Sequence, residues 1–167
     1  EAKACYTNHF TPDHVSTLIG EQVKQVASGK SFTLALTRSG EVWSWGQGGR
    51  DNALGLGGNE EQVRPTKVAA LKGHVVKSLA AGGGRAAAVT ADGALYTFGD
   101  GGEGRLGHGD TQLQASPKRV EVEAWQGRNV TSVACSDSHT AVVLDDGTLY
   151  TFGDGNDGRL GHGNRQD

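Results

Sequence analysis

Residues 95–101 read Leu-Tyr-Thr-Phe-Gly-Asp-Gly, and residues 149–155 read the same seven letters. A second shared string, Gly-Arg-Leu-Gly-His-Gly, stands at 104–109 and again at 158–163. Both pairs are 54 residues apart. Self-similarity at a period of about fifty residues is typical of solenoids and β-propellers. We therefore expect the chain to be built from tandem units.

A looser copy of the same pattern occurs earlier in the chain, as Val-Trp-Ser-Trp-Gly at 42–46 followed by Leu-Gly-Leu-Gly at 54–57. The prolines keep the same phase, because Pro12, Pro65 and Pro117 each begin a Pro-x-x-Val string. They are 53 and 52 residues apart. Three kinds of marker thus share one period, which chance does not readily explain.

Within each unit, short runs rich in β-branched and aromatic residues are separated by glycine turns. Asp-Gly pairs at 92–93 and 146–147 stand where a two-residue hairpin needs positive φ, so the flanking strands are expected to be antiparallel. The expected strands span residues 23–27, 31–37 and 41–45 in one unit, 75–80, 86–90 and 95–98 in the next, and 130–135, 140–144 and 149–152 in the last.

The third strand of a unit carries large apolar groups on both faces, with Leu95 on one side and Tyr96 and Phe98 on the other. A sheet that is wetted on one face would alternate apolar and polar residues, whereas sheets stacked between neighbours bury both faces. Trp43 and Trp45 share one face and are expected to pack between sheets. We predict an all-β chain that forms a partial β-propeller of about three four-stranded antiparallel blades.

The predicted repeat units have boundaries that follow the period. No stretch has helical periodicity over ten residues, and a single helical turn is conceivable only at 69–71 and 121–125. The units are residues 1–22 as the end of a preceding repeat, 23–73, 74–127, and 128–167 as an incomplete repeat, all in one propeller segment.

Composition narrows the class of protein. The 167 residues include 27 glycines, where average usage of about 7% would give about 12. The net charge of −3 offers no footprint for a nucleic-acid backbone, so nucleic-acid binding is not expected. No apolar run is long enough to span a bilayer, and residues 1–10 lack the features of a signal peptide. Cys5 and Cys135 show no paired spacing, which favours a reducing, intracellular compartment, cytoplasmic or nuclear.

The motifs also occur in a characteristic order: Leu-Tyr-Thr-Phe-Gly-Asp-Gly, Leu-Gly-His-Gly, Pro-x-x-Val, and then Ser-Asp-Ser-His-Thr at 136–140 before an Asp-Gly turn. This series resembles the repeat of the regulator of chromosome condensation family, from Pro12 onward. The resemblance implies four-stranded blades, about seven in a complete ring. The sequence starts without Met and stops within a motif, so we expect it to be part of something longer, with the remaining blades supplied by the same chain or by another copy.

The chain departs from the family pattern at the Gly-x-x-His-Thr element. Its histidine is present only as His139, while Phe32 and Arg85 hold the aligned positions. Ser136 stands where the other units have Gly29 and Gly82. His139 is expected to be buried and bonded to backbone between blades; the alternative is a place on a binding face.

Other motifs favour no cofactor and no metal. Gly-x-Gly-x-x-Gly occurs at 99–104 and 153–158, but neither copy precedes a helix in a strand-helix-strand unit, so a glycine-rich loop is the better interpretation. The acids in these loops lack the ligand spacing of a calcium loop. His108 and His162 occupy the same position in successive units, which favours a shared packing role over zinc binding. No Ser or Cys forms a defensible catalytic arrangement, so no bond-making chemistry is expected.

The function that the sequence favours is protein binding through loops, as a scaffold or regulatory subunit. One alternative, implied by the resemblance, is guanine-nucleotide exchange on a Ran-like small GTPase, with Asp137 and His139 as the residues to test. A second is chromatin binding, which the acidic balance disfavours. The predicted protein-binding residues are Asp100, Glu103, Arg105, Trp125, Asp137, His139, Asp154, Asp157 and Arg159.

Overall fold

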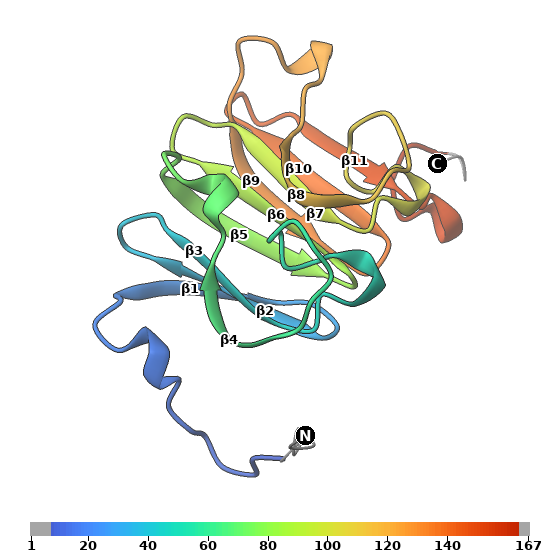
Figure 1. Ribbon diagram of the computed structural model, residues 1–167. Coiled ribbons are helices and arrows are strands. Elements are labelled where there is room, and N and C mark those ends of the chain that lie inside the picture. The colour runs from blue at the N-terminus through green and yellow to red at the C-terminus, as the bar shows by residue number, and fades with distance from the viewer. Residues whose placement is uncertain (1–7, 164–167) are drawn as a thin grey trace.

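Three antiparallel sheets are stacked side by side in the computed structural model, which describes residues 8–163 (Figure 1). We call the sheets blades 1, 2 and 3 in chain order. Blade 1 contains β1 (Val23–Ser28), β2 (Phe32–Thr37), β3 (Val42–Gly46) and β4 (Gln62–Lys67); blade 2 contains β5 (Val76–Gly82), β6 (Arg85–Thr90), β7 (Leu95–Gly99) and β8 (Gln114–Arg119); blade 3 contains β9 (Val130–Cys135), β10 (His139–Leu144) and β11 (Leu149–Gly153). The predicted all-β propeller architecture is confirmed.

Short 3₁₀ turns punctuate the connections between strands. They are η1 (Ser16–Leu18), η2 (Gly49–Asp51), η3 (Ala69–Leu71), η4 (Gly102–Gly104), η5 (Glu123–Trp125) and η6 (Asn156–Gly158). The single helical turns considered at 69–71 and 121–125 are therefore present, as η3 and η5. Among the helices of residues 8–163, none has the length and apolar character needed to cross a membrane.

The fourth strands, β4 and β8, were not located from the sequence. Each contains one of the phased prolines, Pro65 or Pro117, and each pairs with the third strand of its blade at the outer edge of the sheet. Proline cannot donate a hydrogen bond to a ladder and is therefore confined to edge strands. The Pro-x-x-Val marker thus identifies the last strand of a blade and the connector that follows it.

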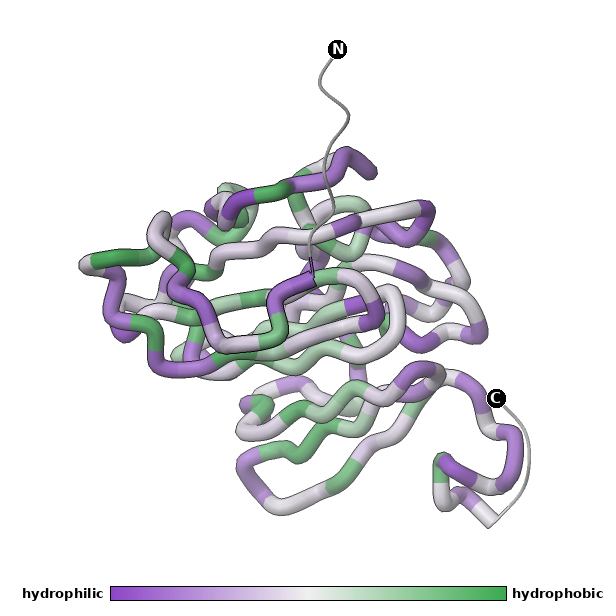
Figure 2. The backbone as a smooth tube through the Cα atoms, turned by 90° about the horizontal axis from the view of Figure 1, so that it is seen from below, coloured by the Kyte–Doolittle hydropathy of each residue, from purple (hydrophilic) through white to green (hydrophobic). Residues whose placement is uncertain are grey.

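The blades contact one another along their first strands, since β1 lies against β5 and β5 against β9. Each hairpin turn also bonds to the next blade, because the amide of Val76 donates to the carbonyl of Gly40 (3.1 Å) and that of Val130 to Gly93 (2.9 Å). Successive blades are thus joined by the same bond at the same position. Hydrophilic stretches concentrate in the loops that join the strands (Figure 2).

Two apolar cores lie between the blades. The first is formed between blades 1 and 2 and includes Leu36 and Phe98; the second lies between blades 2 and 3 and includes Leu95 and Val142. The β7 strand contributes to both cores, as its two-sided apolar pattern predicts. A glycine is required at Gly55, whose φ is +69° and where a Cβ would lie 2.8 Å from the ring of Phe98.

Trp43 and Trp45 are half-buried on the face of β3 that points away from blade 2. Within residues 8–163 no sheet covers that face, and the Nζ atom of Lys67 lies 4.9 Å from the Trp43 ring centroid. Their predicted packing between two blades is therefore not seen. Cys5 and the outer ends of the predicted units 1–22 and 128–167 lie outside the described residues, and the boundaries of the units stay a prediction.

Candidate functional site

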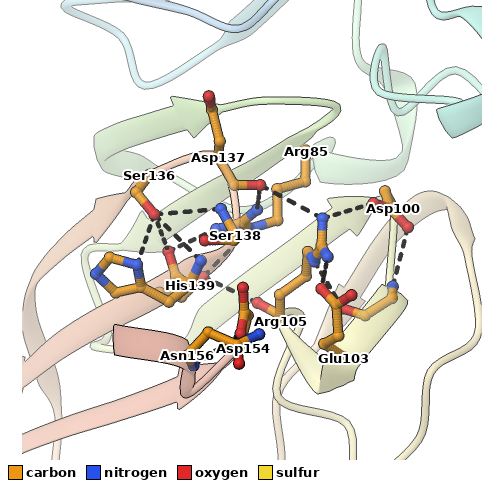
Figure 3. Close-up of polar contacts among 12 residues, drawn as sticks. Arg85, Asp100, Glu103, Arg105, Ser136, Asp137, Ser138, His139, Asp154 and Asn156 are labelled. Carbon is orange, nitrogen blue, oxygen red and sulfur yellow. Dashed lines mark hydrogen bonds and ion pairs between the residues drawn. The ribbon is translucent and has the colours of Figure 1, made fainter. Parts of the chain in front are cut away.

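Polar side chains gather on the rim of blades 2 and 3 that is formed by two kinds of loop. One kind joins the first and second strands of a blade, and the other follows the third strand. We call this surface, made of residues 83–85, 100–105, 136–139 and 154–159, the arginine rim (Figure 3). It contains all of the predicted protein-binding residues except Trp125.

An arginine organises each of the two long rim loops in the same way. The Nε atom of Arg105 donates to the carbonyl of Gly102 (2.6 Å), its Nη1 atom bonds Asp100 (2.8 Å), and its Nη2 atom bonds Glu103. Arg159 makes the equivalent bonds to Asn156 (2.7 Å), Asp154 (2.9 Å) and Asp157 (2.9 Å). Each arginine thus bonds to one backbone carbonyl and two carboxylates of its own loop, and these bonds hold the loop in one conformation.

The first acid of each loop also bonds to the backbone. Asp100 accepts the amide of Gly102 and Asp154 accepts the amide of Asn156, both at 2.9 Å. The backbone hydrogen bond from Asn156, together with the charge of Arg159, holds the pKa of Asp154 below its ordinary value. Asp100 and Asp154 therefore accept hydrogen bonds that fix the conformation of their loops, and the Gly-x-Gly-x-x-Gly string around each of them forms a turn.

Blade 1 has no such arginine clamp. Its corresponding loop begins after Gly46 with Gln47 and places Ala53 immediately before Leu54, where the other units have Arg105 and Arg159 before leucine. The arginine rim is therefore confined to blades 2 and 3.

Two arginines join blade 2 to blade 3 across the rim. The Arg85 guanidinium donates to the carbonyls of Asp137 (3.0 Å) and His139 (2.5 Å), and Nη1 of Arg105 also reaches the carbonyl of Asp137 (3.4 Å). The hydroxyl of Thr140 donates back to the carbonyl of Arg105 (2.9 Å). The 136–139 turn is thus held by the preceding blade.

Arg85 is fully buried although its acceptors, the hydroxyl of Thr140 and two backbone carbonyls, are neutral oxygens. Burial lowers the pKa of its guanidinium below the ordinary value, because the charged form loses its hydration. Short side chains in the rest of β6, such as Ala86 and Ala87, leave room for the stacked sheets on either side. Arg85 holds the position in blade 2 that Phe32 holds in blade 1. The Phe32 ring packs in the core between blades 1 and 2, and the Arg85 side chain reaches from blade 2 to blade 3.

The imidazole of His139 does not bond to backbone between blades, so that expectation is wrong. His139 is half-buried, and its Nδ1 atom lies 2.7 Å from the hydroxyl oxygen of Ser136 in the same turn. The Ser136 oxygen accepts the amides of Ser138 (3.2 Å) and His139 (3.1 Å). This serine caps the turn, which also explains why it replaces glycine there; the pair does not have the arrangement of a nucleophile and its base.

Three carboxylates lie on the outer side of the arginine rim. Glu103 and Asp157 stand at the tips of their loops, at positions with φ of +53° and +60°. The exposed side chain of Asp137 points away from Arg85 and Arg105 (Figure 3). The groups that a partner would meet first are therefore acidic, and the arginines beneath them hold the loops.

The structure corrects the prediction that Trp125 is a protein-binding residue on the same surface as the others. A protein-binding role, as predicted for it from the sequence, requires an exposed ring, but Trp125 is buried, and its ring packs edge-on against Tyr150 with centroids 5.6 Å apart. The large ring fills the space between its connector and blade 3. In the preceding connector, Leu71 fills the equivalent space beside blade 2. It does not lie with the other predicted residues on the rim.

His108 and His162 have the shared packing role that their spacing predicts. The hydroxyl of Thr97 donates to the carbonyl of Leu106 (2.8 Å) and contacts Nε2 of His108 (2.9 Å); Thr151 makes the same pair of contacts to Leu160 and His162. Burial lowers the pKa of His108, and the charge of Lys118 acts in the same direction. Residues 8–163 contain no group of three or more His, Cys, Asp or Glu side chains that could hold a metal ion.

Two models of the regulator of chromosome condensation (RCC1) repeat match the chain, one at residues 39–89 and 92–143 and the other at 23–52, 76–105 and 130–159. The chain is 43% identical over 158 residues to the ultraviolet-B receptor UVR8 of Arabidopsis thaliana and covers 35% of that protein. It is also 43% identical over 157 residues to the human E3 ubiquitin-protein ligase HERC2, of which it covers 3%. These matches include 95% and 92% of the chain.

Solved structures give the same result. Human WBSCR16 superposes with a TM-score of 0.77 at 26% identity, over 90% of this chain and 39% of that one. Prp20p of Saccharomyces cerevisiae superposes with a TM-score of 0.75 at 25% identity, over 87% of this chain and 36% of that one. The repeat models alone match more than half of the residues, so the chain belongs to the regulator of chromosome condensation repeat family.

Proposed function

We propose that the chain is a protein-binding propeller segment whose arginine rim presents a preorganised acidic surface to a basic region of a partner protein. The observation that carries the proposal is the arrangement of Glu103, Asp137 and Asp157 on loops that Arg85, Arg105 and Arg159 hold in place. Preorganised loops cost less conformational entropy on binding than loops that must order. Complementary charge then contributes mainly to specificity and to the rate of association.

Relatives support protein binding in general and leave the partner open. Prp20p has binding properties toward Gsp1p and histones, and HERC2 is an E3 ubiquitin-protein ligase. The chain spans only about a third of UVR8 and Prp20p, and a much smaller share of HERC2. Function as a scaffold or regulatory subunit is accordingly part of the proposal.

The test compares two variants that remove the same number of carboxylates. D137N/D157N changes the rim, whereas E60Q/E61Q changes two exposed acids in the blade 1 loop outside it. After affinity capture with the parent chain identifies a partner, the purified pair is measured by titration. We expect D137N/D157N to weaken binding about tenfold or more, and to reduce its salt dependence, while E60Q/E61Q stays within about twofold. Equal effects of the two variants would refute the rim as the binding surface.

Nucleotide exchange on a Ran-like GTPase is the second candidate, favoured by the structural similarity to Prp20p. Release of a fluorescent guanine nucleotide from the GTPase, with and without the chain, distinguishes the two. Accelerated release that is abolished by H139A or D137A would replace scaffold binding with exchange. An unchanged release rate would leave protein binding as the better account.

A further inference from the structure

A small cavity lies between blades 1 and 2 on the same side of the molecule as the arginine rim. Its volume is about 50 Å³, and its lining includes Ser31, Asp51 and Ala53 of blade 1 and Gly83 and Gly84, which belong to the arginine rim. A cavity of this size has room for more than one water molecule. It borders the blade 1 loop, which has alanine where the other two loops have arginine.

The side of the cavity that blade 2 contributes corresponds to a guanidinium acceptor in blade 3. The carbonyl of Asp137 accepts bonds from Arg85 (3.0 Å) and Arg105 (3.4 Å) of the preceding blade (Figure 3). Gly83 is the equivalent of Asp137, 54 residues earlier. Its carbonyl accepts one bond, from the amide of Lys30 (2.8 Å), and a carbonyl oxygen has two lone pairs. The Gly83 carbonyl can therefore accept a second donor.

Blade 1 contributes a hydroxyl and a carboxylate. In blade 3, Nη1 of Arg159 donates to the hydroxyl of Ser138 (2.6 Å), and Ser31 holds the equivalent position in blade 1. Within residues 8–163, the carboxylate of Asp51 accepts no hydrogen bond and forms no ion pair. It lies so close to Gly84 that a Cβ there would collide with its Oδ2 atom. Carbonyl, hydroxyl and carboxylate groups, which bind the guanidinium groups of blades 2 and 3, thus line the cavity together.

The blade 1 loop lacks the donor that its two copies contain. Beside Asp51, the Oδ1 atom of Asn52 is buried and has no hydrogen-bond partner in the part of the chain that the structure describes. Ala53 stands in the place of the arginine, and the nearby cations Lys30 and Arg50 are exposed and make no bond to Asp51 among residues 8–163. An acceptor without a donor costs free energy when it is buried, so a donor from outside the chain would stabilise this loop.

We propose that the cavity between blades 1 and 2 binds the guanidinium group of an arginine side chain from a partner protein. The inference rests on the proposed function, because the partner docks on the same rim, and it adds the residue type that the partner presents. Two loops contain their own arginine, and the third takes one from the partner. Arginine suits the cavity better than lysine, because its planar guanidinium has five donors in a fixed geometry and bonds several acceptors at once.

NMR titration of the full chain with a short peptide tests the proposal. The probe is acetyl-glycyl-arginyl-glycinamide, and the same peptide with citrulline has a similar shape without the charge. We expect the arginine peptide to shift the amide signals of Gly83, Gly84 and residues 48–53, and the citrulline peptide to bind about tenfold or more weakly. Equal binding of the two peptides, or shifts that spare these residues, would overturn the proposal.

Two variants that each remove one carboxylate locate the site. D51N changes the cavity, whereas E103Q changes an acid that Arg105 already binds. We expect D51N to weaken binding of the arginine peptide about tenfold or more, and E103Q to stay within about twofold. Equal losses would mean that the peptide is attracted to acidic surface in general, which contradicts a specific site.

K30A/R50A tests whether the chain fills the cavity with its own cations. Binding of the arginine peptide should stay within about threefold of the parent, and a gain of about tenfold or more would mean that Lys30 or Arg50 occupies the cavity, against the proposal. The probe is a peptide on the chain alone. Its failure would therefore leave the effect of D137N/D157N on partner binding unchanged, and protein binding through the arginine rim would stand without the arginine site.

Discussion

The strands β7 and β11 have the same five residues, Leu-Tyr-Thr-Phe-Gly, in different surroundings. β7 lies between two neighbouring sheets and pairs with β6 and β8; β11 has one neighbouring sheet and one paired edge among the described residues. Leu95 in β7 is 2% exposed, and Leu149 at the same position of β11 is 62% exposed. Identical sequence thus gives a core strand in one place and a half-covered edge strand in the other.

The difference shows that burial in this chain comes from the next blade, and not from the blade itself. Tyr96 and Phe98 contact blade 1, while Leu95 and Thr97 face blade 3. In β11, Tyr150 and Phe152 still contact blade 2, but Leu149 has no sheet in front of it within residues 8–163. Stability in such arrays is close to a sum of unit and nearest-neighbour terms. The same substitution should therefore have unequal effects in the two strands.

The largest contrast is expected between L95A and L149A. Removing a fully buried leucine side chain costs about 2–5 kcal/mol, whereas an exposed one costs about 0.5 kcal/mol or less. Urea unfolding of the two variants in dilute solution measures both values. Equal losses of stability would mean that blade 3 is covered in solution and that the two strands do not differ.

A buried and a half-buried side chain can also be compared at the rim, because Arg85 and His139 hold equivalent positions in β6 and β10. R85A would remove the guanidinium that donates to the carbonyls of Asp137 and His139 and would empty the buried space that its side chain fills, which together cost about 1–3 kcal/mol. H139A removes one contact to Ser136 at a half-buried site and should cost about 1 kcal/mol or less. Thermal unfolding ranks the two variants, and a greater loss for H139A would contradict the role assigned to Arg85.

A smaller difference is expected between T97V and T151V. Both remove a hydroxyl that donates to a leucine carbonyl, but Thr97 is buried and Thr151 is half-buried. Water can replace the lost donor only at the second site, so T97V should cost about 1 kcal/mol more than T151V. Denaturant midpoints at constant m-value give the comparison; the reverse order would refute it.

The smallest effect concerns pH. Burial lowers the pKa of His108 in the folded state, so the unfolded chain, with a histidine pKa of about 6.5, binds the proton more readily. The associated stability is present above about pH 6.5 and is lost as the pH falls through that value toward the lower folded pKa. H108Q should therefore flatten the dependence of unfolding free energy on pH in this range. The same slope in H108Q and in the parent would show that His108 is not the group responsible.

Much of the fold could be predicted because the repeat supplies several independent markers of one period. The hairpins around Asp92-Gly93 and Asp146-Gly147 and the two-sided apolar pattern of β7 indicate stacked antiparallel sheets, and the structure confirms both. The fourth strands were missed because β4 and β8 are polar, contain proline and lie at an outer edge. Burial periodicity carries little signal for such strands.

The site was predicted less completely. The acids and arginines of the two rim loops come together because their motif repeats with the blades, and the structure places them on one rim. Sequence reasoning missed the role of Arg85, because its carbonyl acceptors lie 52 and 54 residues away in the next blade. It also misplaced Trp125, whose position in an irregular connector gave no sign of the ring of Tyr150 that covers it.

Native-state amide hydrogen exchange of β7 and β11, in a dilute solution where the chain is monomeric, shows whether neighbouring blades determine the stability of each strand. β7 is bonded on both edges and covered on both faces, so its amides at 95–99 should exchange at least about tenfold more slowly than those at 149–153. Equal protection of the two strands would mean that each blade is stable without its neighbour, against the role assigned to blade stacking here.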